Sequence, residues 1–177
     1  MRWIGISGSW RRVNKGIERK IRNIIRKIIR RGDGIISGGA LGVDYIALDE
    51  ALKNDLEAES IKIFLPTTLE VYEAHYRKHA SIGTITNEQA ENLINQLNKL
   101  KRINSQALIE NPDVNFTEEK KKQMYYERNS AVIDASDGLI AFRVKTEKSE
   151  GMGTADTIEK ARKKGIPVKV FQYDLTK

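Results

Sequence analysis

Short apolar runs alternate with helical patterns along most of this chain, and the first two runs lead directly into glycine. Five such runs lie at residues 3–7, 34–37, 61–65, 137–142 and 167–172. Apolar residues recur at helical spacing over residues 15–31, 43–53 and 154–164. Strands that alternate with helices over short connections form a parallel sheet covered on both faces. The sequence therefore predicts an α/β fold of three layers with a central parallel sheet of about five strands.

One long stretch, residues 66–136, interrupts this alternation. Thr86 and Gln89 form a capping-box pattern, after which apolar residues keep helical spacing as far as Ile103. Thr117 is suited to cap a further helix. Neither a repeat nor a low-complexity linker separates this stretch from the rest. We therefore expect residues 1–177 to form a single domain with a helical insertion at about residues 66–120.

The residue composition restricts the chemistry that the chain can carry. Its 177 residues are 40% hydrophobic, which is enough for one core. The absence of cysteine excludes disulfides, thiolate metal sites and a cysteine nucleophile, and two histidines leave little for zinc, so we expect no metal site and no cofactor. No apolar signal segment follows Met1 and no stretch approaches a membrane span, so we expect a cytoplasmic protein without a membrane partner.

The chain carries a formal charge of +7 at pH 7, which attracts polyanions through long-range electrostatics. Much of this charge lies between Lys15 and Arg31, where lysines and arginines occupy the helix faces that isoleucines leave free. Two interpretations are open. The basic side chains form a solvated helix face, or they form a surface for nucleic acid.

Glycines and small hydroxyl residues gather where predicted strands end. In an open parallel sheet the ligand crevice lies outside the carboxyl ends of the strands. Loops without bulky side chains let backbone N–H groups approach a phosphate, and a following helix adds its positive end. Three loops with this character supply the candidate ligand-binding residues Ser7, Gly8, Ser9, Ser37, Gly38, Gly39, Ala40, Gly42, Gly151, Gly153 and Thr154. Neither the P-loop spacing nor G-x-G-x-x-G is present, which argues against NTP hydrolysis and ordinary dinucleotide binding.

The segment from Ser37 to Ala47, Ser-Gly-Gly-Ala-Leu-Gly-Val-Asp-Tyr-Ile-Ala, resembles the S-G-x-A-x-G-[IV]-D-x-x-A signature of the DNA processing protein A (Smf) family and of its relatives in the SLOG superfamily. Residues 126–129 are similar to the F-P-x-R-N segment of the family at the start of a helix, and residues 151–154 take the place of its later S-G-[ST] turn. The resemblance implies a Rossmann-like domain with strand order 3-2-1-4-5, often dimeric, that binds nucleotide-like ligands or single-stranded DNA.

The same resemblance implies roles for three further residues. Asp44 would lie in the first turn after the phosphate loop, Arg128 would reach the phosphate, and Asn129 would help to fix the loops. Simpler explanations remain open. A carboxylate such as Asp44 is favoured at the start of any helix, and Arg128 could instead form a surface ion pair with Glu127 or Glu118.

The chain departs from SLOG enzymes of the Lonely Guy type, which release a base from a nucleoside monophosphate and resemble P-G-G-x-G-T-x-x-E at the last loop. Thr157 stands where the glutamate belongs, and Glu159 is displaced by about 200° around an ideal helix. We therefore expect no catalytic residue and favour a protein that is not an enzyme.

A basic and aromatic cluster follows the third predicted strand, and its members are Tyr72, His75, Tyr76, Arg77 and His79. Such residues can stack on a base, or the tyrosines can simply pack against the sheet.

Three functions remain in consideration. The first is a binding module for a nucleotide or a related phosphate ligand, carried by the three glycine loops. The second is binding of single-stranded DNA, favoured by the charge of +7. The third is a hydrolase similar to phosphoribohydrolases, which the missing glutamate places last. We also expect a homodimer, as the resemblance implies.

Overall fold

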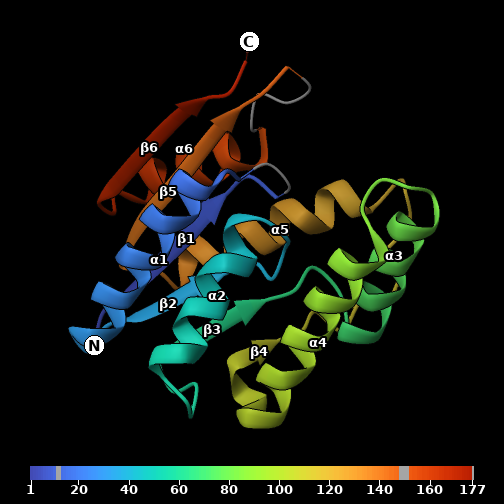
Figure 1. The fold of residues 1–177 in the computed structure, drawn as a ribbon, viewed down its shortest axis with the longest axis horizontal. Helices are drawn as coiled ribbons and strands as arrows, with labels where there is room; N and C mark the ends of the chain where they lie inside the picture. Colours follow the sequence, from blue (N-terminus) through green and yellow to red (C-terminus); the bar gives the residue numbers. More distant parts are fainter. Residues whose placement is uncertain (11–12, 148–151, 177) are drawn as a thin grey trace.

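The computed structural model describes residues 1–10, 13–147 and 152–176, which fold around a six-stranded sheet (Figure 1). All neighbouring strands pair in parallel, in the order β4-β3-β2-β1-β5-β6. The strands are β1 (Trp3–Gly8), β2 (Gly34–Ser37), β3 (Ile61–Phe64), β4 (Leu108–Ile109), β5 (Gly138–Lys145) and β6 (Val168–Asp174).

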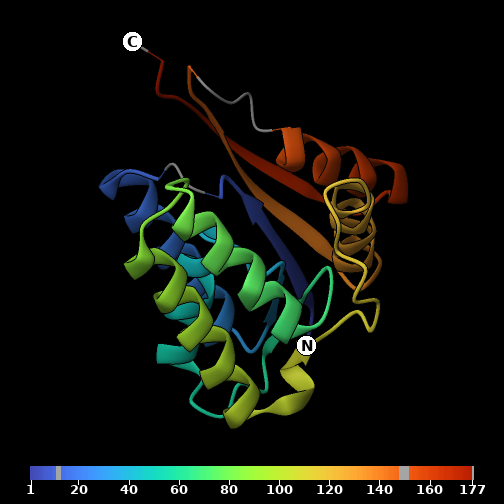
Figure 2. The same cartoon turned by 90° about the vertical axis from the view of Figure 1, so that its right-hand side faces the viewer.

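Helices cover both faces of the sheet, as Figure 2 shows, with α1 to α4 on one side and α5 and α6 on the other. The helices are α1 (Lys15–Arg30), α2 (Val43–Asn54), α3 (Leu69–Ser81), α4 (Asn87–Ile103), α5 (Lys121–Asp134) and α6 (Met152–Lys164), with a 3-10 turn, η1, at Ser105–Ala107. The predicted α/β fold of three layers is therefore confirmed.

The five predicted strands lie in the order that the resemblance implied, but the count of about five strands was too low. The additional strand, β4, has two residues, and Leu108 and Ile109 pair with Ile63 and Phe64 at the sheet edge. Two residues are too few to produce a periodic pattern, and β4 lies inside the stretch that was predicted to be a helical insertion.

Helix α1 shows why part of the basic segment is not a solvated face. Its isoleucines at 17, 21, 25 and 28 are buried against the sheet, as their spacing predicted. Arg22 and Arg26, however, turn toward α2 and both form ion pairs with Glu50, at 3.2 and 2.9 Å. Glu50 is only 4% exposed, so these two arginines neutralise a carboxylate between the helices and are not available as simple solvated charges.

The insertion forms a helical hairpin of α3 and α4 that leads into η1 and β4. The capping box is confirmed: the backbone of Gln89 donates to Thr86 Oγ1 at 3.0 Å and the Gln89 side chain accepts from the backbone of Thr86 at 2.9 Å. The predicted cap at Thr117 is wrong. Its hydroxyl accepts from the Lys120 backbone in a turn, and α5 begins only at Lys121.

Strand β1 lies between β2 and β5, so the strand order reverses at this point. Strands β2, β3 and β4 follow one another on one side of β1, and β5 and β6 lie on its other side. The carboxyl ends of β1, β2 and β5 therefore meet at one edge, which is where an open α/β sheet forms its ligand crevice. None of the helices in the described part of the chain combines the length and the apolar character that a membrane span requires.

Candidate functional site

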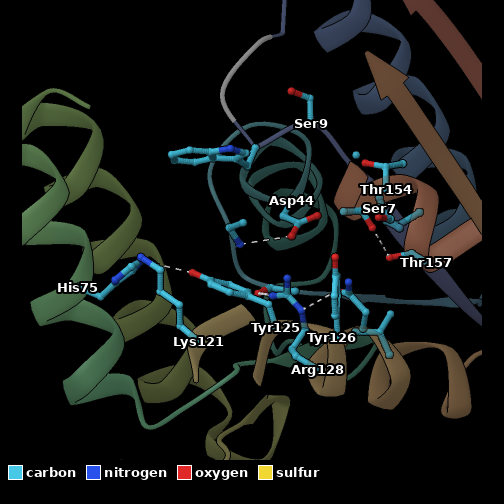
Figure 3. Close-up of a pocket in the computed structure, with 18 of the residues that line it drawn as sticks. Ser7, Ser9, Asp44, His75, Lys121, Tyr125, Tyr126, Arg128, Thr154 and Thr157 are labelled. Atoms are coloured by element: carbon cyan, nitrogen blue, oxygen red, sulfur yellow. Dashed lines mark hydrogen bonds between the residues drawn. The ribbon is translucent and has the colours of Figure 1, made fainter. Parts of the chain in front are cut away.

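A cavity of about 650 Å³ opens at this edge of the sheet (Figure 3). Most of the predicted ligand-binding residues line it: Ser7, Gly8, Ser9, Gly38, Ala40, Asp44, Arg128, Asn129, Gly153 and Thr154. Figure 3 shows Ser7, Thr154 and Thr157 on one side and His75 on the opposite side. We call the part formed by Gly8, Gly38, Gly153 and their neighbours the glycine crevice. The tertiary structure thus brings three loops that are distant in the sequence to one place.

Three predicted residues do not line the cavity. Ser37 is fully buried at the end of β2. Gly39 faces the core, because a Cβ atom there would lie 2.8 Å from Leu65 Cδ2 and 2.9 Å from Ile63 Cγ2. Gly42 packs against the first loop. These three residues belong to the second loop but lie on the side of it that faces away from the cavity. A fourth, Gly151, lies outside the described residues.

Gly42 joins the first two loops. Its φ of +74° belongs to the left-handed region, and an added Cβ atom would collide with the carbonyl oxygen of Ser9 and lie 2.7 Å from the carbonyl carbon of Trp10. The backbone N–H of Val43 donates to the same Ser9 oxygen at 2.9 Å. The first loop therefore rests directly on the backbone of the second, at the start of α2.

Arg128 reaches the cavity from α5, where residues 126–129 lie inside the helix and not at its start as predicted. Its guanidinium donates to the carbonyl oxygen of Gly38 and to Asn129 Oδ1, and it lies over the ring of Tyr125 at 5.4 Å. A Cβ atom at Gly38 would collide with this guanidinium. Arg128 therefore lies inside the glycine crevice, where the resemblance placed it, and the alternative of a surface ion pair with Glu127 or Glu118 does not describe its contacts.

Asp44 occupies the first turn of α2 and is 8% exposed. Its carboxylate accepts a hydrogen bond from the backbone N–H of Ala40 at 3.3 Å, which ties the second loop to the helix that follows it. Burial raises the pKa of Asp44, while the charge of Arg128 opposes this shift. The residue therefore acts at least as a helix-start and loop-anchoring carboxylate.

Asn129 connects the two helices on the far face of the sheet. Its side-chain amide donates to Asp156 Oδ2 at 3.1 Å, and Lys160 binds the same oxygen at 2.6 Å. Thr157 lines the cavity where the Lonely Guy pattern has glutamate, and its hydroxyl donates to the carbonyl of Gly153 at 3.1 Å. Asp156, the carboxylate next to it in sequence, is bound by the amide of Asn129 and the ammonium group of Lys160.

Aromatic rings form the other side of the cavity, and sequence reasoning found only some of them. The members that line it are Trp10, His75, Tyr76, His79, Tyr125 and Tyr126, here called the aromatic end. The proposed packing role is correct for Tyr72, which is 1% exposed and does not line the cavity. Tyr76 is also buried, at 3% exposed, but it lines the cavity together with His75 and His79. Arg77 instead pairs with Glu91 at 3.1 Å.

Several lining residues were missed by the sequence analysis as ligand candidates, and four of them are aromatic or positively charged. These four are Trp10, Lys121, Tyr125 and Tyr126. Trp10 directly follows the first glycine loop, and the other three precede Arg128 by two to seven residues on the same helix. Helical spacing from Arg128 was therefore a usable signal for Tyr125 and Lys121, which lie three and seven residues away on the same helix face, but not for Tyr126, which lies two residues away.

We expect the protein to lose stability as the pH falls from 6.5 to 4, because burial, the neighbouring His79 and Lys121 lower the pKa of His75 from 6.5 to about 4. In this range the unfolded chain binds a proton that folded His75 does not, so the free energy of unfolding decreases by about 2 kcal/mol. Urea unfolding in chelator-treated buffer across this range measures the effect. His75→Gln should remove this part of the pH dependence, and equal slopes in both proteins would contradict the prediction.

Among the described residues, no group of three or more His, Cys, Asp or Glu side chains is placed to hold a metal ion. The donor set of the glycine crevice is instead suited to an anion. It consists of backbone N–H groups, hydroxyls, and the guanidinium of Arg128.

Several solved structures share this fold. DNA processing protein A from Helicobacter pylori, described for its single-stranded DNA binding mode, is 22% identical with a TM-score of 0.62, and the match covers 96% of this chain and 64% of that one. The same protein from Streptococcus pneumoniae is 18% identical with a TM-score of 0.57, covering 96% and 50%. The molybdenum cofactor carrier protein from Chlamydomonas reinhardtii is 18% identical with a TM-score of 0.51, covering 96% and 75%.

This chain thus spans about two thirds and one half of the two DNA processing proteins. At these identities the likeness establishes the fold alone, and no curated protein matches the sequence. The family itself is established by its sequence profile, which is described as DNA recombination-mediator protein A and matches residues 1–177. Because this profile matches the chain from residue 1 to residue 177, the chain belongs to the DNA recombination-mediator protein A family.

Proposed function

We propose that this chain binds a nucleotide, with the phosphate in the glycine crevice and the base at the aromatic end. One observation carries the proposal: a single cavity of about 650 Å³ joins small-residue loops and Arg128 to a set of aromatic rings. This volume lies within the range of about 300–1,000 Å³ that is usual for small-ligand sites. The two kinds of lining match the two parts of a nucleotide.

The phosphate half is supported by the positions of two helix starts. Helix α2 begins at Val43, directly after the second glycine loop, and Gly153 and Thr154 lie in the first turn of α6. Free N–H groups and the helix dipole give each helix start a partial positive charge. Arg128 adds a full charge with a planar fork of donors that suits phosphate.

The base half is supported by the rings around His75. Trp10 lies 6.2 Å from His79, and Tyr125 lies 6.4 Å from His75, measured between ring centroids. Trp10 is 36% exposed, which leaves a large ring accessible at the cavity. Such rings bind bases of any sequence by stacking, at about 1–3 kcal/mol for each base.

A second candidate is binding of single-stranded DNA through the same cavity. Membership of the DNA recombination-mediator family favours it, as does the single-stranded DNA binding of the similar Helicobacter pylori protein. Lys121 lines the cavity, and Lys122 follows it on α5, so cationic side chains continue from the cavity toward the surface. A strand would then place one nucleotide in the cavity and its neighbours outside.

Fluorescence anisotropy with single- and double-stranded DNA over a salt series separates these candidates, with a free nucleoside monophosphate as competitor. If DNA is the ligand, we expect a preference for the single strand, because only unpaired bases can stack on the aromatic end. We expect this preference to persist near physiological salt and the free nucleotide to compete.

Binding that ignores strandedness and collapses with salt would reject DNA as the specific ligand, because a purely electrostatic contact weakens in proportion to the phosphates neutralised. A thermal shift with the free nucleotide alone would then support the nucleotide. Absence of both signals would reject the proposed function.

A further inference from the structure

Both histidines of the chain, His75 and His79, lie four residues apart on α3 and therefore on one helix face. Their Nε2 atoms are 3.1 Å apart, and both rings line the cavity. The rings are perpendicular, with centroids 4.4 Å apart. We propose that His75 and His79 together form an open site for a divalent transition metal ion that prefers imidazole, such as Zn²⁺, Co²⁺ or Ni²⁺.

The separation of the two nitrogens fits a shared metal ion. Nitrogens bound to one Zn²⁺ at about 2.0–2.1 Å would be about 2.9 Å apart at a right angle and about 3.3 Å apart in a tetrahedron. The 3.1 Å between the Nε2 atoms of His75 and His79 lies between these limits. For both lone pairs to point at one ion, each ring must turn by about 35–45° from the line that joins the two nitrogens.

Without metal, the same atoms form a hydrogen bond in which one Nε2–H donates to the other Nε2. Metal binding requires the donating ring to carry its proton on Nδ1 instead. This change of tautomer leaves both rings neutral and releases no net proton, since each neutral imidazole keeps one N–H. The hydrogen bond and the metal site are therefore alternative states of one pair.

Two imidazoles leave the remaining coordination positions open. A closed structural zinc site has four protein ligands, whereas open sites keep positions for water or a bound ligand. The hydroxyl of Tyr125 forms a hydrogen bond with His75 Nε2 at 3.4 Å. When a metal ion takes this nitrogen, the hydroxyl is released and can hydrogen-bond to a group that fills such a position. Lys121 also lines the cavity, but its charge is offset by Glu118 at 2.7 Å. The site is thus suited to an exchangeable ion that faces the cavity.

The test uses the tag-free full chain, stripped of metal and without nucleotide, so that it does not depend on the proposed function. Titration with Co²⁺ should give a visible absorption band that saturates at one ion per chain. His75→Gln and His79→Gln should each abolish the band, because each removes one nitrogen ligand. Lys78→Gln, an exposed position on the same helix, should retain it.

Imidazole NMR signals of the wild-type chain provide a measurement that requires no variant to fold. Because the sequence has two histidines, both sets of signals can be assigned and followed. One equivalent of Zn²⁺ should shift the signals of both rings together. A response of only one ring or of neither ring, or equal Co²⁺ binding by the wild type and the two Gln variants, would overturn the proposal.

Discussion

Replacing Arg128 with alanine is expected to weaken nucleotide binding by about tenfold to a hundredfold, because a charge-assisted hydrogen bond contributes about 1.5–3 kcal/mol. Arg128 enters the glycine crevice from α5 and is held beside Gly38 by the carbonyl oxygen of that residue. Isothermal titration with a nucleoside monophosphate measures the loss. Arg128→Lys should fall between the wild type and Arg128→Ala, since it keeps the charge but loses the planar fork.

Arg30→Ala is the matched control, because Arg30 is an exposed arginine near the end of α1. Its removal changes the net charge equally and should leave the affinity nearly unchanged. Arg26 is unsuitable for this purpose, since it forms an ion pair with the buried Glu50. Equal losses in Arg128→Ala and Arg30→Ala would show that long-range charge, and not the crevice, governs binding.

Gly42→Ala is expected to lower the free energy of unfolding by about 3 kcal/mol or more, because backbone strain at a positive φ and a steric collision add together. The residue has a φ of +74°, and the new methyl group would meet the backbone of Ser9 and Trp10. Relief of the collision would separate the first loop from the second. Urea unfolding followed by circular dichroism measures the change.

Gly83→Ala separates the two causes. Gly83 has a φ of +80°, similar to that of Gly42, but an added Cβ atom would have no neighbour within 4 Å among the described residues. It should therefore cost only the strain of a left-handed alanine, about 1 kcal/mol. If both substitutions destabilise the protein equally, the close approach of the two loops at Gly42 does not contribute to stability.

Several features of the fold and of the glycine crevice could be predicted from local sequence alone. Gly8 and Gly38 were predicted to lie at strand ends because apolar runs stop there, and the structure places both at the cavity. The isoleucines of α1 were predicted to be buried from their spacing, and the capping box of α4 from two residues. Each of these depends on neighbours within one or two helical turns, so the local pattern contains the necessary information.

Predicting the position of Arg128 required the resemblance to a family, because 90 residues separate Arg128 from Gly38, whose carbonyl oxygen it binds. Local spacing gives no estimate of a contact between chain segments so far apart. For the same reason, the sequence did not predict the ion pair between Arg26 and Glu50. It also did not predict the edge strand β4, because this strand is defined by its pairing with β3.

The sequence by itself determined the layers of the fold, the strand ends that carry glycine, and the scarcity of histidine. Only the tertiary structure decided the direction of each side chain at those strand ends. Gly38 faces Arg128, whereas the adjacent Gly39 faces the core at Leu65. The scarcity of histidine argued against a metal, yet both histidines meet at one wall of the cavity. Periodicity records which residues share a face of one element, but a binding site depends on how faces of different elements are packed together.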